Sequence, residues 1–201
     1  MIELAASFDA QLAPLAPFLI YLIAGGLIFL ETGVLLGFFL PGDSLLFSAG
    51  LVAASTKNVN IVILVIVIFL GAFFGDQVGF VLGRTIGRSY LDKHDSRRIK
   101  AMVIRSERFY EHTGWWAVVA ARFFPWIRTF VPPIAGASKM NYYKFLSANS
   151  LGALLWGGGI TLAGYYAATV PLVKTWSYGI ATFFICASLV SALVNYLRLR
   201  R

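Results

Sequence analysis

Five charged residues lie inside long apolar stretches of the sequence: Glu31, Asp43, Asp76, Arg122 and Arg128. An ionised side chain at the centre of a bilayer costs about 2.5–3.5 kcal/mol on insertion scales, so each of them needs a physical reason. Acids in such a place can exchange protons, and arginines can fork onto the oxygens of a phosphate. The set predicts a site in which both arginines bind an anionic substrate and Glu31 and Asp43 exchange protons.

Two breaks in the helical pattern stand beside these charges. Pro41 removes a backbone donor, Gly42 permits a turn, and Asp43 follows directly. Pro125 kinks the chain between the two arginines, which directs both guanidinium groups toward one cavity. We expect Pro41, Gly42 and Pro125 to support the site by making these breaks.

Each charged residue also has a purely structural interpretation. Asp43 can accept from free amides as the N-cap of the following helix. The arginines can form salt bridges with Glu31, Asp43 or Asp76. Asp76 is either a polar contact that holds helices together or a supporting member of the site. The sequence alone leaves these alternatives open.

The composition indicates a membrane protein. The chain has 201 residues, 59% of them hydrophobic and 13% charged, with a mean hydropathy of +0.77, outside the range of soluble domains. The net charge of +8 gathers in the polar stretch 84–113 and at the C-terminal end, as in cytoplasmic flanks of membrane helices rather than a nucleic-acid surface. Glu3 and Asp9, with no nearby Lys or Arg, argue against a secretory signal peptide, so we expect the N-terminus to stay on the chain.

We predict an all-α polytopic membrane protein that forms one domain over residues 1–201. Apolar runs of roughly 20 residues can span the bilayer core, and four qualify: 14–36, 59–83, 145–169 and 172–197. Two further stretches, 37–56 and 114–138, are broken by Pro, Gly and charge. We predict re-entrant hairpins there, because irregular backbone at membrane depth persists only where protein or a water-filled cavity satisfies it.

The orientation follows if the basic segment 84–113 is cytoplasmic. Span 59–83 then runs inward, hairpin 37–56 enters from the outside, and hairpin 114–138 enters from the inside. The last two spans bring the chain back to a basic end, so we expect both termini in the cytoplasm.

The two halves of the chain resemble each other. The same spacing of twelve residues separates Gly71 from Gly83 and Gly152 from Gly164. Two upstream motifs correspond in the same way: Phe39-Leu40-Pro41 with Ala49-Gly50, and Phe123-Phe124-Pro125 with Ala135-Gly136. Interrupted apolar segments in matching places of two inverted halves indicate a transporter site at the bilayer midplane.

These motifs together resemble the DedA family of membrane proteins, also called SNARE-associated or VTT-domain proteins. The resemblance covers about residues 30–160 and rests on the order and spacing of the following: Glu31 before Phe39-Leu40-Pro41-Gly42-Asp43, Gly75-Asp76 with Gly83-Arg84, Arg122-Phe123-Phe124-Pro125-Trp126-Ile127-Arg128, Gly136 with Met140 and Phe145, and Asn149 with Gly152-Ala153 and Trp156. It implies an inverted pair of re-entrant hairpins and a role in moving lipids across the bilayer.

The resemblance also implies a substrate and a location. Some bacterial relatives are associated with returning undecaprenyl phosphate to the cytoplasmic leaflet. The residues matching Glu31, Asp43, Arg122 and Arg128 are functionally required in that family, with proton coupling proposed. We therefore expect a multi-pass protein of the bacterial cytoplasmic membrane.

We predict proton-coupled transport of an anionic phospholipid or polyprenyl phosphate, with protons and membrane lipids as partners and no nucleic acid. The alternatives are a proton-coupled transporter of small cations or drugs, a membrane-bound lipid-modifying enzyme, or an assembly protein. An enzyme is disfavoured because no nucleophile–base pair is visible, and no residue cluster has metal or nucleotide spacing, so we expect no cofactor. A homo-oligomer stays open.

The topology can be tested by cysteine labelling after replacement of the single native Cys186. A cysteine near Lys57 should react with an impermeant reagent added outside, and one near Lys100 only after the inner face is opened. Labelling of both from the same side would contradict the inverted hairpins.

Overall fold

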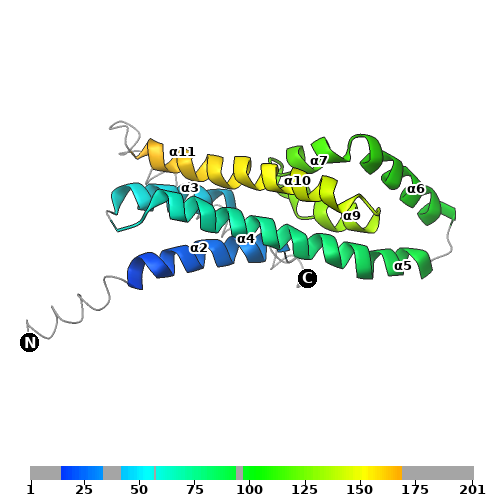
Figure 1. The fold of residues 1–201 in the computed structure, drawn as a ribbon, viewed down its shortest axis with the longest axis horizontal. Helices are drawn as coiled ribbons and strands as arrows, with labels where there is room; N and C mark the ends of the chain where they lie inside the picture. The colour runs from blue at the N-terminus through cyan, green and yellow to red at the C-terminus, as the bar shows by residue number, and fades with distance from the viewer. Residues whose placement is uncertain (1–14, 34–41, 57, 94–96, 169–201) are drawn as a thin grey trace, which may run out of the picture.

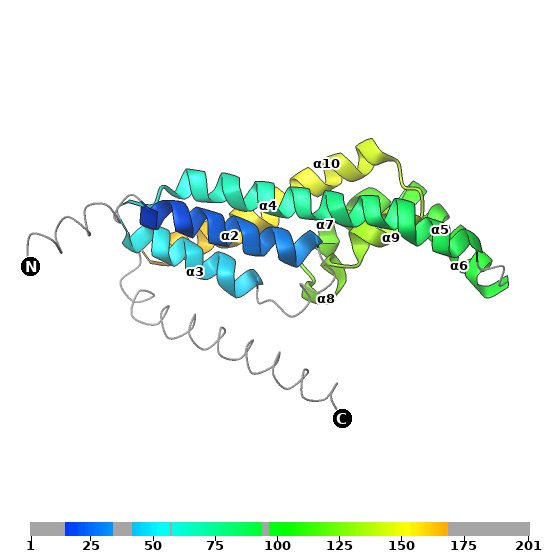
Figure 2. The ribbon, with the colours of Figure 1, turned by 90° about the horizontal axis from the view of Figure 1, so that it is seen from below.

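The computed structural model is an elongated bundle of α-helices (Figures 1 and 2). The residues it describes are 15–33, 42–56, 58–93 and 97–168. Pro41 and the predicted span 172–197 lie outside them. In chain order the described elements are α2 (Leu15–Gly33), α3 (Gly42–Ser55), α4 (Ile61–Leu82), the π-helix η2 (Gly83–Gly87), α5 (Arg88–Lys93), α6 (Arg97–His112), α7 (Gly114–Ala121), α8 (Pro125–Arg128), α9 (Val131–Ala137), α10 (Tyr142–Ala153), the π-helix η3 (Leu154–Gly158) and α11 (Gly159–Ala167).

Two helical runs within the described residues are long and apolar enough to cross a membrane: Ile61–Leu91 and Tyr142–Ala167. They contain the predicted span 59–83 almost entirely and most of the predicted span 145–169. Each begins at an asparagine N-cap, Asn60 or Asn141, whose side chain accepts from two amides of the first turn. The two runs are antiparallel and extend along the length of the bundle (Figure 1).

A row of glycines on α4 and η2 packs against both hairpins. Gly71, Gly75, Gly79, Gly83 and Gly87 recur at every fourth position and therefore share one helix face. Helix α2 packs against the first two, and α9 packs against the other three. Small residues let helix backbones approach closely in a membrane, where apolar burial gives little drive for association.

Helices α2 and α3 form the first hairpin of the bundle. Helix α2 runs parallel to α4, with Gly25 facing Val67 and Gly33 facing Gly75, and α3 returns in the opposite direction (Figure 2). Residues 42–55 form one unbroken helix, and residues 37–41, where the hairpin predicted over 37–56 begins, lie outside the described residues. Helix α2 lies within the predicted span 14–36 and α3 within the predicted hairpin 37–56, and the two helices pack as antiparallel arms.

The second hairpin reverses direction where it was predicted. Helix α7 runs parallel to α10, and Trp115 near its start donates to the Ser147 hydroxyl at 2.9 Å. The chain then breaks into the short helix α8, which begins at Pro125, and returns as α9 beside α4 and η2. The reversal within 114–138 is therefore as predicted, while its entry into a membrane from one side stays a prediction.

Equivalent contacts relate the two halves. A Cβ atom added to Gly50 of α3 would overlap the carbonyl oxygen of Thr161 in α11 and lie 3.0 Å from its carbonyl carbon. A Cβ atom added to Gly136 of α9 would overlap the carbonyl oxygen of Phe80 in α4 and also lie 3.0 Å from its carbonyl carbon. The second arm of each hairpin thus packs on the long helix of the other half.

Two glycines of the long helices also contact the second arm of the other half. A Cβ atom on Gly83 would overlap the Pro133 carbonyl, and one on Gly164 would overlap the Phe47 carbonyl. An offset of 81 residues relates the long helices, and an offset of 86 relates the second arms. The predicted repeat is therefore present in the packing as two interlocked, oppositely directed halves.

These glycine contacts make a stability prediction. We expect Gly50→Ala and Gly136→Ala to lower the thermal midpoint of the detergent-solubilised protein, because overpacking of this kind costs about 1–3 kcal/mol. Gly159→Ala is the matched control, since a Cβ atom there meets nothing within 4 Å. Alanine gains about 1 kcal/mol of helix propensity over glycine at all three positions. Equal midpoints for the three variants would contradict the close approach.

Candidate functional site

The ends of the two hairpins meet at Arg128, the last residue of α8. Its Nη1 donates to Asp43 Oδ1 at 2.8 Å, and its Nη2 pairs with Glu31 Oε1. Asp43 lies in the first turn of α3 and Glu31 lies near the end of α2. Arg128 is 8% exposed and Glu31 is 2% exposed, whereas the Asp43 side chain is 42% exposed. One guanidinium therefore joins both arms of the first hairpin, and only the Asp43 acid has an open face.

Gly42 allows this arrangement because Glu31 lies across the start of α3. A Cβ atom on Gly42 would overlap the Glu31 carboxylate. Any other residue at this position would push the acid away from Arg128. Gly42 therefore leaves the Glu31 carboxylate its space beside Arg128, while the turn predicted at Pro41 and Gly42 adjoins residues outside the described ones.

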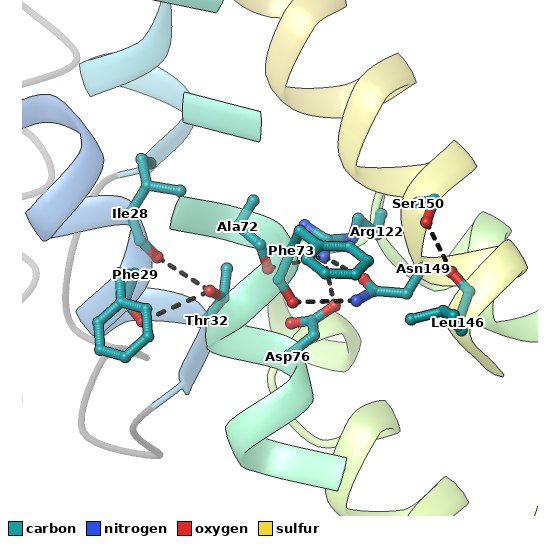
Figure 3. A network of polar contacts seen from close by, with 10 residues as sticks. All are labelled: Ile28, Phe29, Thr32, Ala72, Phe73, Asp76, Arg122, Leu146, Asn149 and Ser150. Atoms are coloured by element: carbon teal, nitrogen blue, oxygen red, sulfur yellow. Dashed lines mark hydrogen bonds and ion pairs between the residues drawn. The ribbon is translucent and has the colours of Figure 1, made fainter. Parts of the chain in front are cut away.

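Arg122, the residue after α7, binds both long helices (Figure 3). Its Nη2 pairs with Asp76 Oδ2 and donates to Asn149 Oδ1 at 2.6 Å and to the Ala72 carbonyl at 3.1 Å. The Asn149 amide in turn donates to the Phe73 carbonyl at 3.1 Å. Arg122 is 3% exposed, and its Nε has no hydrogen-bond partner among the described residues. The Arg122 side chain is thus fixed through Nη2, while its Nε–H is a donor without a partner among the described residues.

Trp156 lies between the two arginines. Its ring centroid is 4.6 Å from Arg128 Cζ and 5.7 Å from Arg122 Cζ, within the range of cation–π attraction. Its Nε1 donates to Asp43 Oδ1 at 2.7 Å. Trp156 belongs to η3, and π-helical turns inside α-helices occur frequently at functional sites. The indole thus joins the Arg128 and Arg122 clusters into one polar core.

The predicted site residues that the structure describes are nearly all brought together. The ion pairs that the sequence left open are present: Arg128 with Glu31 and Asp43, and Arg122 with Asp76. Asp76 both links α4 to the second hairpin and belongs to the polar core. Asp43 follows the first residue of α3, so it is not the N-cap of that helix. Pro125 begins α8, where it sets the kink before Arg128.

Two residues of this core have no role predicted from the sequence. Asn149 is fully buried and Trp156 is 1% exposed, and each donates to or accepts from a charged member of the site. A single amide inside an apolar span was the available signal for Asn149. Nothing in the sequence indicated that the Trp156 indole would face two arginines.

The core holds three carboxylates and two guanidinium groups, one more acid than base when all are ionised. Within the described part of the chain, no group of three His, Cys, Asp or Glu side chains could hold a metal ion. What the arrangement can do is bind an anion at the arginines and exchange protons at the acids.

Comparison with known proteins gives the family. The VTT domain model matches residues 40–166. An uncharacterised membrane protein of Mycobacterium tuberculosis (strain H37Rv) is 43% identical over 177 residues, covering 87% of this chain and 78% of the relative. Protein DedA of Escherichia coli (strain K12) is 34% identical over 184 residues, covering 90% of this chain and 84% of the relative. No solved structure matches. The chain belongs to the VTT-domain, or DedA, family of membrane proteins.

Proposed function

We propose that this protein carries an anionic lipid phosphate across the bacterial cytoplasmic membrane in exchange for protons. Undecaprenyl phosphate is the substrate suggested by the family resemblance. The observation that carries the proposal is the buried polar core in which Arg128 bridges Glu31 and Asp43 while Arg122 keeps a free donor.

The arginines have the geometry for an anionic headgroup. Arg128 already presents its two terminal nitrogens to two separate oxygens, which is the fork that binds phosphate in bidentate fashion. Arg122 adds a buried Nε–H without a partner in the described chain, so it can donate to a further oxygen while its Nη2 stays bound. A phosphate seated between them would face two fixed positive charges.

The acids link this anion to protons. A phosphate that takes Arg128 displaces Glu31 and Asp43 from their shared cation. Each carboxylate left ionised and unpaired at membrane depth costs about 2.5–3.5 kcal/mol on insertion scales, and protonation removes that cost. Anion binding and proton uptake are thereby coupled through one guanidinium.

The location of the core fits a transport cycle. In transporters with inverted repeats, the substrate site lies near the bilayer midplane where the repeats meet. The core contains residues from both hairpins and both long helices, and Asp43 is the acid with an open face. Protons can therefore reach the core at Asp43 while the other four charges stay buried.

That same exposure supports one alternative. A small cation could reach Asp43 directly, in which case the arginines would only balance charge. A liposome assay distinguishes the two functions: lipid-phosphate crossing that responds to a pH gradient supports the proposal, and uptake of small cations without lipid crossing supports the alternative.

The arginine variants test the anion site. We expect Arg128→Lys and Arg122→Lys to lose most transport of labelled polyprenyl phosphate in proteoliposomes while the protein still inserts, because lysine keeps the charge but cannot fork. Arg108→Lys, in an exposed position of α6, is the matched control and should keep wild-type activity.

Exchanging the charges of Arg128 and Asp43 tests whether the ion pair alone is sufficient for transport. Restored transport in the double variant Arg128→Asp with Asp43→Arg would show that only the ion pair matters. Full activity of the two lysine variants would likewise leave the arginines a charge-balance role alone.

The acid variants test proton coupling. We expect Glu31→Gln and Asp43→Asn to preserve folding while transport loses its dependence on a pH gradient, because the amide resembles the protonated acid. Asparagine at position 43 keeps an oxygen to accept from Trp156, so the packing of the indole should persist. A normal rate with a normal pH response in either variant would remove that residue from the coupling scheme.

A further inference from the structure

A groove of about 570 Å³ runs between α4 and the α10–η3 helix. Phe69 of α4 and Leu151 and Leu154 of the second helix line it, together with Ser147 and Ser150. Both serine hydroxyls donate back to carbonyls of their own helix, at 3.1 Å and 2.8 Å respectively. The groove therefore offers an apolar wall with few free donors.

The groove straddles the axis that relates the two halves. Ile66 and Ser147 are separated by 81 residues, as are Phe69 and Ser150, and all four line it. This is the offset that relates the long helices through their asparagine caps and glycine contacts. An axis between inverted repeats lies in the plane of the membrane, so the groove opens at the midplane, at equal depth from both leaflets.

The groove adjoins the polar core. Phe69 stacks on Phe73 with 5.8 Å between ring centroids, and the Phe73 carbonyl accepts from Asn149. Asn149 binds Arg122 on one side and precedes Ser150, a groove residue, on the other (Figure 3). Asn149 and Phe73 thus form the boundary between the groove and the arginine.

The surroundings decide what can fill the groove. Ile66 is 50% exposed, Leu151 is 36% exposed and Leu154 is 51% exposed, so the rim is apolar. In a membrane such a rim faces lipid tails rather than water. A molecule with a hydrocarbon chain and an anionic headgroup matches both the apolar groove and the arginine of the adjoining polar core.

We propose that the groove between α4 and α10 binds one hydrocarbon chain of the lipid whose phosphate binds at Arg122. The inference rests on the proposed function and adds where the chain lies. The chain stays in the groove at the midplane while the headgroup passes through the polar core, and head and chain meet at Asn149. Access at equal depth from both leaflets allows the chain to enter or leave in either direction.

Photo-crosslinking tests this in the full-length protein reconstituted in phospholipid vesicles. The probe is a polyprenyl phosphate with a photoreactive group on its chain, and the labelled peptides are mapped by mass spectrometry. We expect the label on α4 and α10 groove residues, reduced at least several-fold by unlabelled polyprenyl phosphate but not by the uncharged polyprenol of equal chain length. Leu162, on α11 and 37% exposed, is the control surface, where neither competitor should change the labelling.

A variant adds a second measurement. Ser150→Trp should fill the groove and lower both labelling and transport several-fold, whereas Leu162→Trp should change neither. Equal competition by phosphate and polyprenol would identify ordinary boundary lipid and overturn the inference. If the wild-type protein transports lipid phosphate but the label is found elsewhere, the inference about the groove is wrong while the proposed function is still supported. Protein that neither transports nor specifically binds the probe overturns both.

Discussion

A buried guanidinium needs acceptors, and Arg128 finds them on the opposite hairpin. Glu31 and Asp43 come from two arms of a hairpin that precedes Arg128 by more than eighty residues in the chain. The close glycine contacts between the halves hold the hairpin ends near each other, which is the arrangement that this bridge requires. Much of the backbone packing at the glycines is explained by the need to bring Arg128 close to these two acids.

The inverted halves are alike in backbone and unlike in charge. Gly50 and Gly136 meet the opposite long helix through the same contact, yet the first hairpin ends in acids and the second in arginines. A strictly symmetric site would gather like charges, which repel each other. Because the two halves carry different side chains on a similar backbone, opposite charges meet near the axis that relates the halves. A proton can there compete with an arginine for an acid, and an anion can compete with an acid for an arginine.

The sequence predicted the charged core and the second hairpin better than it predicted the first. Arg122 and Arg128 flank a proline, so the break in the chain was visible. A break is visible at Pro41 and Gly42 as well, but composition cannot decide whether the apolar stretches on either side of it are a complete span and a separate hairpin or the two arms of one hairpin. The choice depends on which helix each arm packs against, and that depends on glycines more than fifteen residues away. Trp156 was overlooked for a similar reason, since its partners are brought to it only by the folded hairpins.

The ion pairs themselves are a poor explanation for stability. Replacing a buried salt bridge by well-packed apolar residues is often neutral or stabilising, by about 1–4 kcal/mol. The close contacts of Gly83 with Pro133 and of Gly164 with Phe47 join the halves through backbone, without any charge. A fold that can close on glycine contacts does not need two arginines and three acids in its centre. Their presence there, with one Arg122 donor unsatisfied among the described residues, is what the proposed transport of an anionic ligand would require.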